Sequence, residues 1–196
     1  MRYRVGMTRY PESHKQETRA RIVAVASGVA LTQGFSAGID RIMKAAGLTR
    51  GGFYAHFRSK AELEDAVIAQ AMDNTRAWLL SRSPEERSGK ALRAIVDVYL
   101  SERHRDEPEN GCPLPALSAD VARADDDTRD TYTSRLLLWA SAVEARLPAG
   151  KTPSFDRALA IVALLAGGVA LARAVREPAL SKRILDVCKR AALRLE

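Results

Sequence analysis

A short stretch near the amino end, residues 47–60, combines residue types that bind phosphates and nucleic-acid bases. Its sequence, GLTRGGFYAHFRSK, contains three cations, a tyrosine and a histidine, all of which donate hydrogen bonds. Gly51 and Gly52 remove side-chain bulk, as is needed where a backbone approaches another molecule closely. Donors of this kind position a protein on the phosphates and base edges of a duplex. The stretch therefore predicts nucleic-acid recognition.

The aromatic side chains of the same stretch indicate how it is held in place. Phe53 and Phe57 lie four residues apart, so both fall on one face of a helix. We expect this face to pack into a small hydrophobic core. The side chains that then point outward are those of Arg50, Tyr54, His56 and Lys60.

Nearly every other segment of the 196-residue chain has the apolar periodicity of a helix. The first three expected helices are at about 14–33, 39–46 and 50–57. A fourth begins at 60 and ends at a break at 83–86, and a fifth begins at this break and ends at about 103. The last four are at about 116–124, 126–147, 154–176 and 178–195. Their ends are marked by capping residues: Gly34, Gly47, Thr49, Ser59 with Glu62, and Ser83 with Pro84. Residues 104–115 are expected to form a loop. The predicted fold class is all-α, with about nine helices.

Residues 39–57 have the layout of a helix-turn-helix, in which a glycine turn joins two short helices. The second helix of this motif lies in the major groove of DNA, with its first residues against base edges. The surrounding sequence, AGIDRIMKAAGLTRGGFYAHFRSKAELEDAVI, resembles the DNA-binding region of TetR-family transcriptional regulators. The shared features are the AAG turn at 45–47, FYAHF at 53–57 and the SKAEL start of the fourth helix.

The resemblance implies a DNA-binding head at 15–75 and a ligand-binding and dimerisation body at 84–196. It further implies a cytoplasmic homodimer that represses transcription from a palindromic operator and is released by a small-molecule inducer, without enzymatic activity, cofactor or metal. The expected DNA-binding residues are Thr49, Arg50, Gly51, Gly52, Tyr54, His56 and Lys60, with Arg41 and Lys44 in place of a phosphate-binding threonine that Gly38 and Ile39 do not supply. The inducer is expected among the helices of 86–147, near Tyr99, Leu117, Leu136, Leu138 and Trp139.

The positive charge of the chain is concentrated in the expected head. Residues 1–60 carry eleven Lys or Arg side chains and three acidic ones, a net charge of +8, whereas residues 61–196 carry 20 basic and 21 acidic side chains, a net charge of −1. A basic head on a neutral body is typical of nucleic-acid binding, and a solvated basic surface is the alternative. Arg2, Arg4 and Arg9 precede the first helix, either as a DNA-gripping arm or as a disordered end.

The stretch AIVALLAGGVALARAV at 160–175 is apolar on nearly every side. Arg157 and Arg173 bound it too closely for a membrane span, and residues 1–17 are not expected to be a signal peptide because they lack an apolar core. One side is expected to face the core and the other a second subunit, with a central helix of a monomer as the alternative. The residues expected at this interface are Leu164, Gly167, Gly168 and Leu171.

Cys112 and Cys188 are the only cysteines, too few for a disulfide framework and without metal-ligand spacing. Cys112 comes just before a helix start, where a lowered thiol pKa would suit a redox sensor, but a buried packing residue is the favoured interpretation. With His104, Cys112 also defines a competing hypothesis, an all-α thiol enzyme. A third hypothesis is an interaction module that does not depend on these DNA contacts. No ordered catalytic triad or phosphate loop is recognisable, so we do not expect an enzyme.

Overall fold

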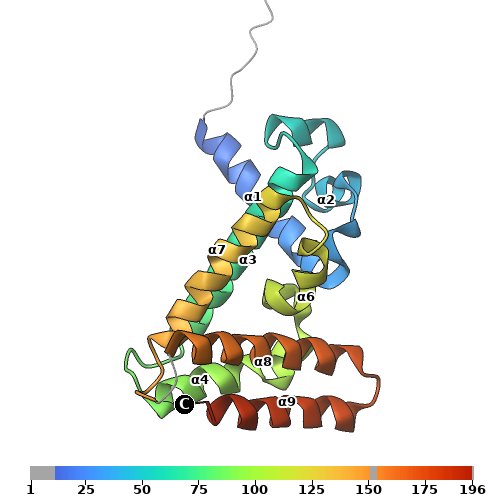
Figure 1. Ribbon diagram of the computed structural model, residues 1–196. Coiled ribbons are helices and arrows are strands. Elements are labelled where there is room, and N and C mark those ends of the chain that lie inside the picture. The colour runs from blue at the N-terminus through green and yellow to red at the C-terminus, as the bar shows by residue number, and fades with distance from the viewer. Residues whose placement is uncertain (1–11, 151–153, 196) are drawn as a thin grey trace, which may run out of the picture.

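The computed structural model describes residues 12–150 and 154–195, and this part of the chain forms helices without a strand (Figure 1). Its nine α-helices confirm the all-α prediction for the described residues. They are α1 (Glu12–Gln33), α2 (Ile39–Ala45), α3 (Lys60–Leu80), α4 (Gly89–Tyr99), α5 (Glu102–Asp106), α6 (Pro113–Val121), α7 (Asp126–Glu144), α8 (Ser154–Ala174) and α9 (Pro178–Leu193). Short 3-10 helices are η1 (Gly34–Ser36), η2 (Arg50–Ala55) and η3 (Pro108–Asn110). Arg2, Arg4 and Arg9 lie outside the described residues.

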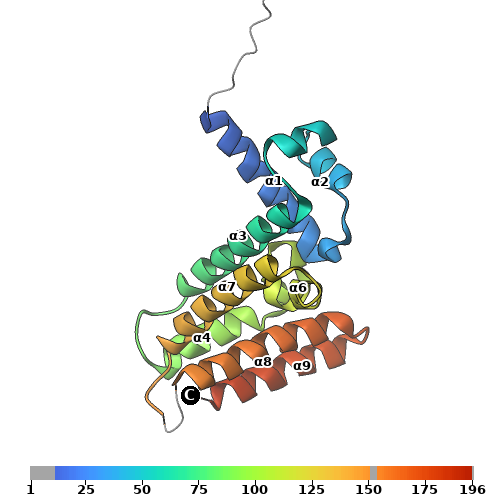
Figure 2. The same ribbon diagram turned by 45° about the horizontal axis from the view of Figure 1, so that its top comes forward.

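The helices divide into a small head and a larger body that share the long α3 (Figures 1 and 2). The head consists of α1, α2, η2 and the first turn of α3. It lies at the opposite end of the molecule from α8 and α9, which pack against each other. Because α3 leaves the head and runs along α7 into the body, a shift of α3 in the body would be felt in the head.

Two phenylalanines anchor η2 in the head. Phe53 and Phe57 are buried, and their rings stack with centroids 5.5 Å apart. The guanidinium of Arg19, on α1, lies 4.5 Å from the centre of the Phe57 ring, within the range of a cation–π contact. The face that holds Phe53 and Phe57 is therefore directed inward, as the sequence predicted.

The start of α3 also agrees with the sequence. The Ser59 Oγ accepts a hydrogen bond from the Glu62 backbone N–H at 3.1 Å. The returning bond differs by one position from a regular capping box, because the Glu62 Oε2 accepts from the N–H of Arg58 at 2.8 Å. Both bonds satisfy backbone donors at the junction between η2 and α3, and they fix η2 relative to the start of α3.

The predicted start of the fifth helix at Ser83 is wrong. Helix α4 begins at Gly89, and Ser88 is its N-cap, because the Ser88 Oγ accepts from the Ala91 N–H at 3.1 Å. The Ser83 hydroxyl instead donates to the Ala91 carbonyl at 2.9 Å. Serine is a favourable N-cap residue at either position. In the folded chain the Ser83 hydroxyl is used in the hydrogen bond to Ala91, and Ser88 caps the helix.

The predicted loop at 104–115 is also wrong in part. The expected fifth helix ends at Tyr99, and Ser101 caps a separate helix, α5, through a bond from the His104 N–H at 3.1 Å. η3 and the first turn of α6 occupy most of the remainder. The polar composition that suggested a loop reflects the many caps and short helices of this segment.

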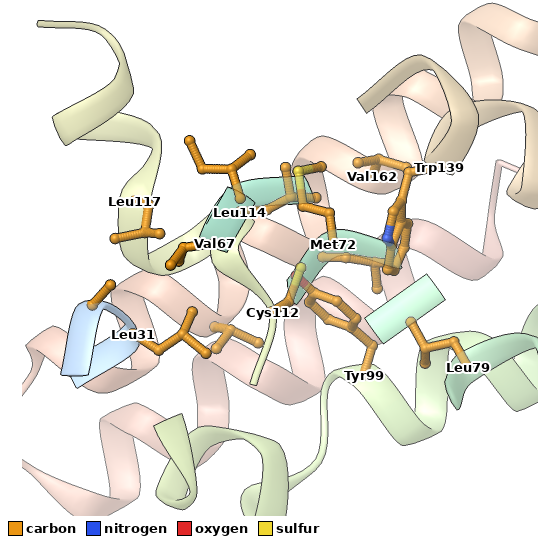
Figure 3. Packing of buried hydrophobic residues seen from close by; sticks show 14 of the residues in the cluster. Leu31, Val67, Met72, Leu79, Tyr99, Cys112, Leu114, Leu117, Trp139 and Val162 are labelled. Atoms are coloured by element: carbon orange, nitrogen blue, oxygen red, sulfur yellow. The ribbon is translucent and has the colours of Figure 1, made fainter. Parts of the chain in front are cut away.

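The centre of the body is a packed aromatic and aliphatic core (Figure 3). Tyr99 and Trp139 are buried, with ring centroids 5.6 Å apart in an edge-to-face arrangement, and Leu117 is buried in the same core. The cavity beside Trp139 measures about 10 Å³, too small for an organic ligand. These side chains were expected to line an inducer pocket, but Tyr99, Trp139 and Leu117 fill the body instead, and Leu138 lies exposed on its surface.

The end of α1 meets the body at Gly34, where the backbone has φ +70°. The Asp120 Oδ2, on α6, accepts from the Phe35 N–H at 3.3 Å, and a methyl group added at Gly34 would lie 2.5 Å from that oxygen. We predict that Gly34→Ala lowers the free energy of unfolding by roughly 1 to 2 kcal/mol, because alanine is strained at positive φ and also displaces Asp120.

The matched control is Gly28→Ala, in the middle of α1, where a methyl group would have no neighbour within 4 Å. This change should instead stabilise the chain by up to about 1 kcal/mol through helix propensity. Urea unfolding followed by circular dichroism measures both effects. Equal stability of the two variants would contradict the proposed strain at Gly34.

Candidate DNA-binding surface

The segment expected to be the second helix of the helix-turn-helix is a 3-10 helix, η2, and not the α-helix predicted for 50–57. Thr49 occupies the N-cap position with extended backbone angles, but its side chain makes no capping hydrogen bond to the described residues. The two glycines that follow are weak α-helix formers, which accounts for the tighter and shorter turn. The position of η2 after α2 and the Gly47 turn, where φ is +70°, matches the predicted order.

Arg50 and Tyr54 are the most prominent exposed side chains of η2. Tyr54 is 61% exposed, and it contacts Phe53 edge-to-face with ring centroids 5.2 Å apart. The Arg50 Nη1 lies 2.9 Å from the Asp40 Oδ2 on α2, in an ion pair that is itself exposed. Neither side chain is enclosed, so both are available to an incoming duplex. Sequence reasoning missed the partner Asp40, because its spacing of ten residues from Arg50 follows no local pattern.

The adjacent glycines of η2 differ in their surroundings. A methyl group added at Gly51 would meet nothing within 4 Å, so this position faces open solvent. At Gly52 the same group would lie 3.8 Å from both the Met43 Cε and the Thr49 Oγ1, which is ordinary packing distance. DNA could therefore approach the backbone closely at Gly51, whereas Gly52 faces Met43 and Thr49 within the head.

The basic residues of α2 are also exposed. Arg41 and Lys44 extend from a helix whose N-cap is Gly38, and this glycine offers no side-chain hydrogen bond. Their inward neighbours Ile42 and Met43 are buried. Helix α2 thus presents cations on one side and a hydrophobic face to the head on the other.

Lys60 and His56 are more constrained than the sequence suggested. The Lys60 ammonium donates to the Phe35 carbonyl and pairs with Glu64 at 3.0 Å, so a phosphate would have to compete with both. Partial burial lowers the pKa of His56, and the nearby positive charges of Lys15 and Arg19 lower it further. Its Nδ1 is buried and has no hydrogen-bond partner among the described residues.

Cys112 lies away from this surface, fully buried in the body beside Tyr99 (Figure 3). Burial raises the pKa of its thiol to about 11, the opposite of what a reactive thiolate requires. His104 does not act as a base for it, because the His104 Nε2 accepts from the Cys112 backbone N–H at 3.1 Å. The Nδ1–H is then the donor to the Tyr99 carbonyl, at 2.7 Å. The site is thus built for packing and for fixing the backbone, which argues against the redox sensor and the thiol enzyme.

The neutral form of His104 makes the stability of the chain depend on pH. Burial lowers the pKa of His104, so below about pH 6.5 the unfolded chain binds more protons than the folded chain. The free energy of unfolding should therefore fall as the pH decreases from 7 to 5, by up to about 1.4 kcal/mol per pH unit for this group.

The control variant is His104→Gln, in which this contribution is absent. His56, with its lowered pKa, and Asp65, whose carboxyl has a pKa raised by burial, remain in both chains. The difference in slope between the two chains therefore isolates His104. Parallel stability curves from chemical unfolding at several pH values would contradict the prediction.

The expected dimer surface has an exposed apolar side. Leu171 on α8 is exposed, as are Leu180 and Val187 on α9, whereas Leu164 is half-buried. Gly167 is exposed, and a methyl group added there would meet nothing within 4 Å. Helix α8 is long and apolar enough to cross a membrane by length and composition alone, but close to half of its apolar stretch is buried inside the chain.

Gly168 does not belong to that exposed side. A methyl group at Gly168 would lie 2.9 Å from the Leu100 Cδ2 and 3.0 Å from the Cys188 Cβ. Gly168 thus permits close packing of α8 within its own chain, and its assignment to the dimer interface is corrected. Adjacent positions on a helix point about 100° apart, which explains why one glycine faces solvent and the next faces the core.

The arrangement of α2, η2 and α3 defines a helix-turn-helix head on an all-helical body, the architecture of a DNA-binding regulator. The model of the bacterial regulatory proteins of the tetR family matches residues 22–67. The chain is similar to the HTH-type transcriptional regulator SrpR of Pseudomonas putida, with 44% identity over 99 residues that cover 50% of this chain and 45% of SrpR. It is also similar to the uncharacterized HTH-type transcriptional regulator TtgW, again of Pseudomonas putida, with 42% identity over 99 residues that cover 50% of this chain and 72% of TtgW.

The fold extends the likeness to the whole chain. A crystal structure of a TetR transcriptional regulator from Chloroflexus aurantiacus superposes with a TM-score of 0.74 at 24% identity, covering 93% of this chain and 95% of that one. The chain belongs to the TetR family of transcriptional regulators. Proteins of this family bind DNA and are generally not enzymes. The matched part of the chain spans less than half the length of SrpR.

Proposed function

We propose that this chain is a ligand-responsive repressor that binds a palindromic operator as a homodimer. The observation that carries the proposal is the exposure of Arg50 and Tyr54 on η2, above the buried anchors Phe53 and Phe57. Arginine at the start of a recognition helix reads guanine through two hydrogen bonds, and a tyrosine hydroxyl donates to a phosphate. Arg41, Lys44, Thr49, Gly51, Gly52, His56 and Lys60 are proposed to complete the surface.

The two proposed functions, DNA binding and ligand binding with dimerisation, belong to the two ends of the molecule. Residues 15–75 are proposed to bind DNA and residues 84–196 to bind the ligand and the second subunit. Leu164, Gly167 and Leu171 of α8 are proposed to lie in the subunit interface, together with Leu180 and Val187 of α9. A symmetric dimer places two recognition elements in successive major grooves about 34 Å apart, which matches a palindrome.

Repression would end when a ligand favours a conformation in which the two heads no longer match that spacing. The ligand must bind this released conformation more tightly than the DNA-fitting one, because equal affinity for both shifts nothing. Helix α3 is the element proposed to carry the shift, since it belongs to the head at one end and packs along α7 at the other. The proposed location is the cytoplasm, and no cofactor or metal is invoked.

The alternative centred on Cys112, a thiol enzyme or redox sensor, has no observation in its favour. Burial of the thiol and its raised pKa both oppose it. Under our proposal, Cys112→Ser keeps operator binding and ligand release. Loss of ligand release in a well-folded Cys112→Ser chain would revive the sensor hypothesis.

The direct test is a titration of the purified chain with DNA from upstream of its own gene, at several salt concentrations. We expect a saturable complex whose affinity falls steeply with salt, because phosphate contacts release counterions. Unrelated DNA of the same length should bind about 1,000-fold or more weakly at physiological salt. Equal affinity for both DNAs would refute a sequence-specific repressor.

A further inference from the structure

A groove between the head and the body is explained neither by DNA binding nor by dimerisation. It lies between α1, α3 and the segment around η3, and its volume is about 530 Å³. Volumes of roughly 300 to 1,000 Å³ are typical of sites for small organic molecules. In contrast to the packed core around Tyr99 and Trp139, this groove has room for a ligand.

Gly28 creates part of that room. It lies in the middle of the 22-residue α1, where glycine costs about 1 kcal/mol of helix stability relative to alanine. Its backbone is not among those with positive φ, and a methyl group added there would meet no atom within 4 Å. Neither backbone geometry nor packing in the described chain therefore requires a glycine. What the missing side chain leaves is open volume in the groove.

The polar groups of the groove are largely unused by the protein. The carboxamides of Gln70, Asn74 and Asn110 make no hydrogen bond to another described residue. Each carboxamide offers both donors and an acceptor. The groove thus presents a set of free groups that suit a ligand with amide-like hydrogen bonding.

The charge of the lining selects among ligands. Among the residues that the structure describes, Glu109 is the only carboxylate that lines the groove, and no lysine or arginine lines it. The imidazole of His104 is kept neutral by burial, which lowers its pKa, and both of its nitrogens face backbone partners. An anion would meet the like charge of Glu109, whereas an uncharged molecule would not be opposed and a cation would be attracted by that carboxylate. The nearby guanidinium of Arg173, beside Gly111, already donates to the backbone carbonyls of His104 and Arg105.

We propose that this groove binds a small uncharged or cationic molecule with amide-like donors and acceptors, through Gln70, Asn74 and Asn110. One side of the occupant contacts α1 of the head, and the other contacts α3 and η3 of the body. Its binding therefore fixes the angle at which α1 leaves the body. A resulting change in DNA affinity rests on the repressor function proposed above, whereas binding of the small molecule to the groove does not.

Three probes of similar size and different charge test the site: nicotinamide, the 1-methylnicotinamide cation and the nicotinate anion. Side-chain NH₂ resonances of Gln70, Asn74 and Asn110 are followed by two-dimensional NMR of the full chain at increasing probe concentration. We expect saturable shifts with nicotinamide and 1-methylnicotinamide, and affinity at least about tenfold weaker for nicotinate. Saturating nicotinamide should also change the affinity of the chain for its upstream DNA.

Gly28→Leu fills the groove and should weaken the nicotinamide-induced shifts by about tenfold or more. Ala145→Leu, at an exposed position at the end of α7 that does not line the groove, is the control for added bulk and should leave them unchanged. Asn74→Ala provides a second test, because it removes a contact without adding bulk. Cooperative unfolding at melting temperatures no lower than that of the original chain shows that the variants are folded.

The outcomes separate the two proposals. No saturable shift at these carboxamides with any probe, equal binding of nicotinate, or undiminished binding by Gly28→Leu would overturn the site. Saturable binding without any change in DNA affinity would overturn its coupling to the head. A chain that binds the probes but shows no preference for its upstream DNA would refute the repressor and leave the groove established.

Discussion

A chain carrying both Arg50→Ala and Tyr54→Ala is expected to lose specific operator binding while remaining folded. An arginine paired with a guanine contributes about 1 to 3 kcal/mol of discrimination. A phosphate contact such as that proposed for Tyr54 adds roughly 1 kcal/mol. Together these losses correspond to an affinity about 30- to 1,000-fold weaker. Fluorescence anisotropy with labelled upstream DNA measures the effect.

The fold should tolerate both changes, because Tyr54 is 61% exposed and Arg50 has only an exposed ion pair with Asp40 among the described residues. Tyr54→Phe keeps the ring and removes the hydroxyl, so it isolates the proposed phosphate contact. Arg103→Ala, an exposed arginine of the body, controls for the loss of one positive charge. If specific binding survived in the double variant, η2 would not be the recognition element, and the interaction-module hypothesis would gain ground.

Leu171→Glu is expected to convert the proposed dimer into monomers and thereby to weaken operator binding. A carboxylate placed in an apolar subunit interface loses its hydration without gaining a partner, which costs several kcal/mol. We expect the dimer dissociation constant to rise by about 100-fold or more, as measured by sedimentation equilibrium. The isolated chain should keep its secondary structure, because Leu171 is 59% exposed within it.

The adjacent glycines provide a sharper control for this interface. Gly168→Ala should destabilise each chain, because its methyl group would lie 2.9 Å from Leu100. Gly167→Ala should leave the single chain intact, since nothing lies within 4 Å of the added group. If Leu171→Glu still formed a dimer, the subunit contact would lie on another surface. Equal stability of the Gly167→Ala and Gly168→Ala chains would contradict the assignment of Gly167 to the exposed side of α8 and of Gly168 to the core.

Much of the fold could be predicted because local rules act on neighbouring residues. Ser59 and Glu62 lie three apart, and the N–H of Glu62 does bond to the Ser59 hydroxyl in the structure. The spacing of Phe53 and Phe57 likewise predicted that both rings are buried. The resemblance to the TetR family rests on this same local segment, which the family model also matches.

Predictions failed where several residues satisfied the same local rule. Ser83 and Ser88 are both acceptable helix caps, and the choice depends on a hydrogen bond from Ser83 to Ala91 that closes only in the folded chain. The segment around His104 reads as a polar loop, yet its imidazole is buried between two backbone groups. Neither outcome follows from composition.

The sequence alone determined the all-α class, the position of most of the long helices, the basic character of the head and the aromatic anchors of η2, because these depend on spacing, capping and charge along the chain. Only the tertiary structure decided that Gly51 and Gly167 face outward while Gly52 and Gly168 pack inward. It also decided that the body's aromatic residues form a packed core and that a groove of about 530 Å³ lies beside Gly28. These features depend on which helices come to lie side by side, and contacts between distant segments are not encoded in the local spacing of residues.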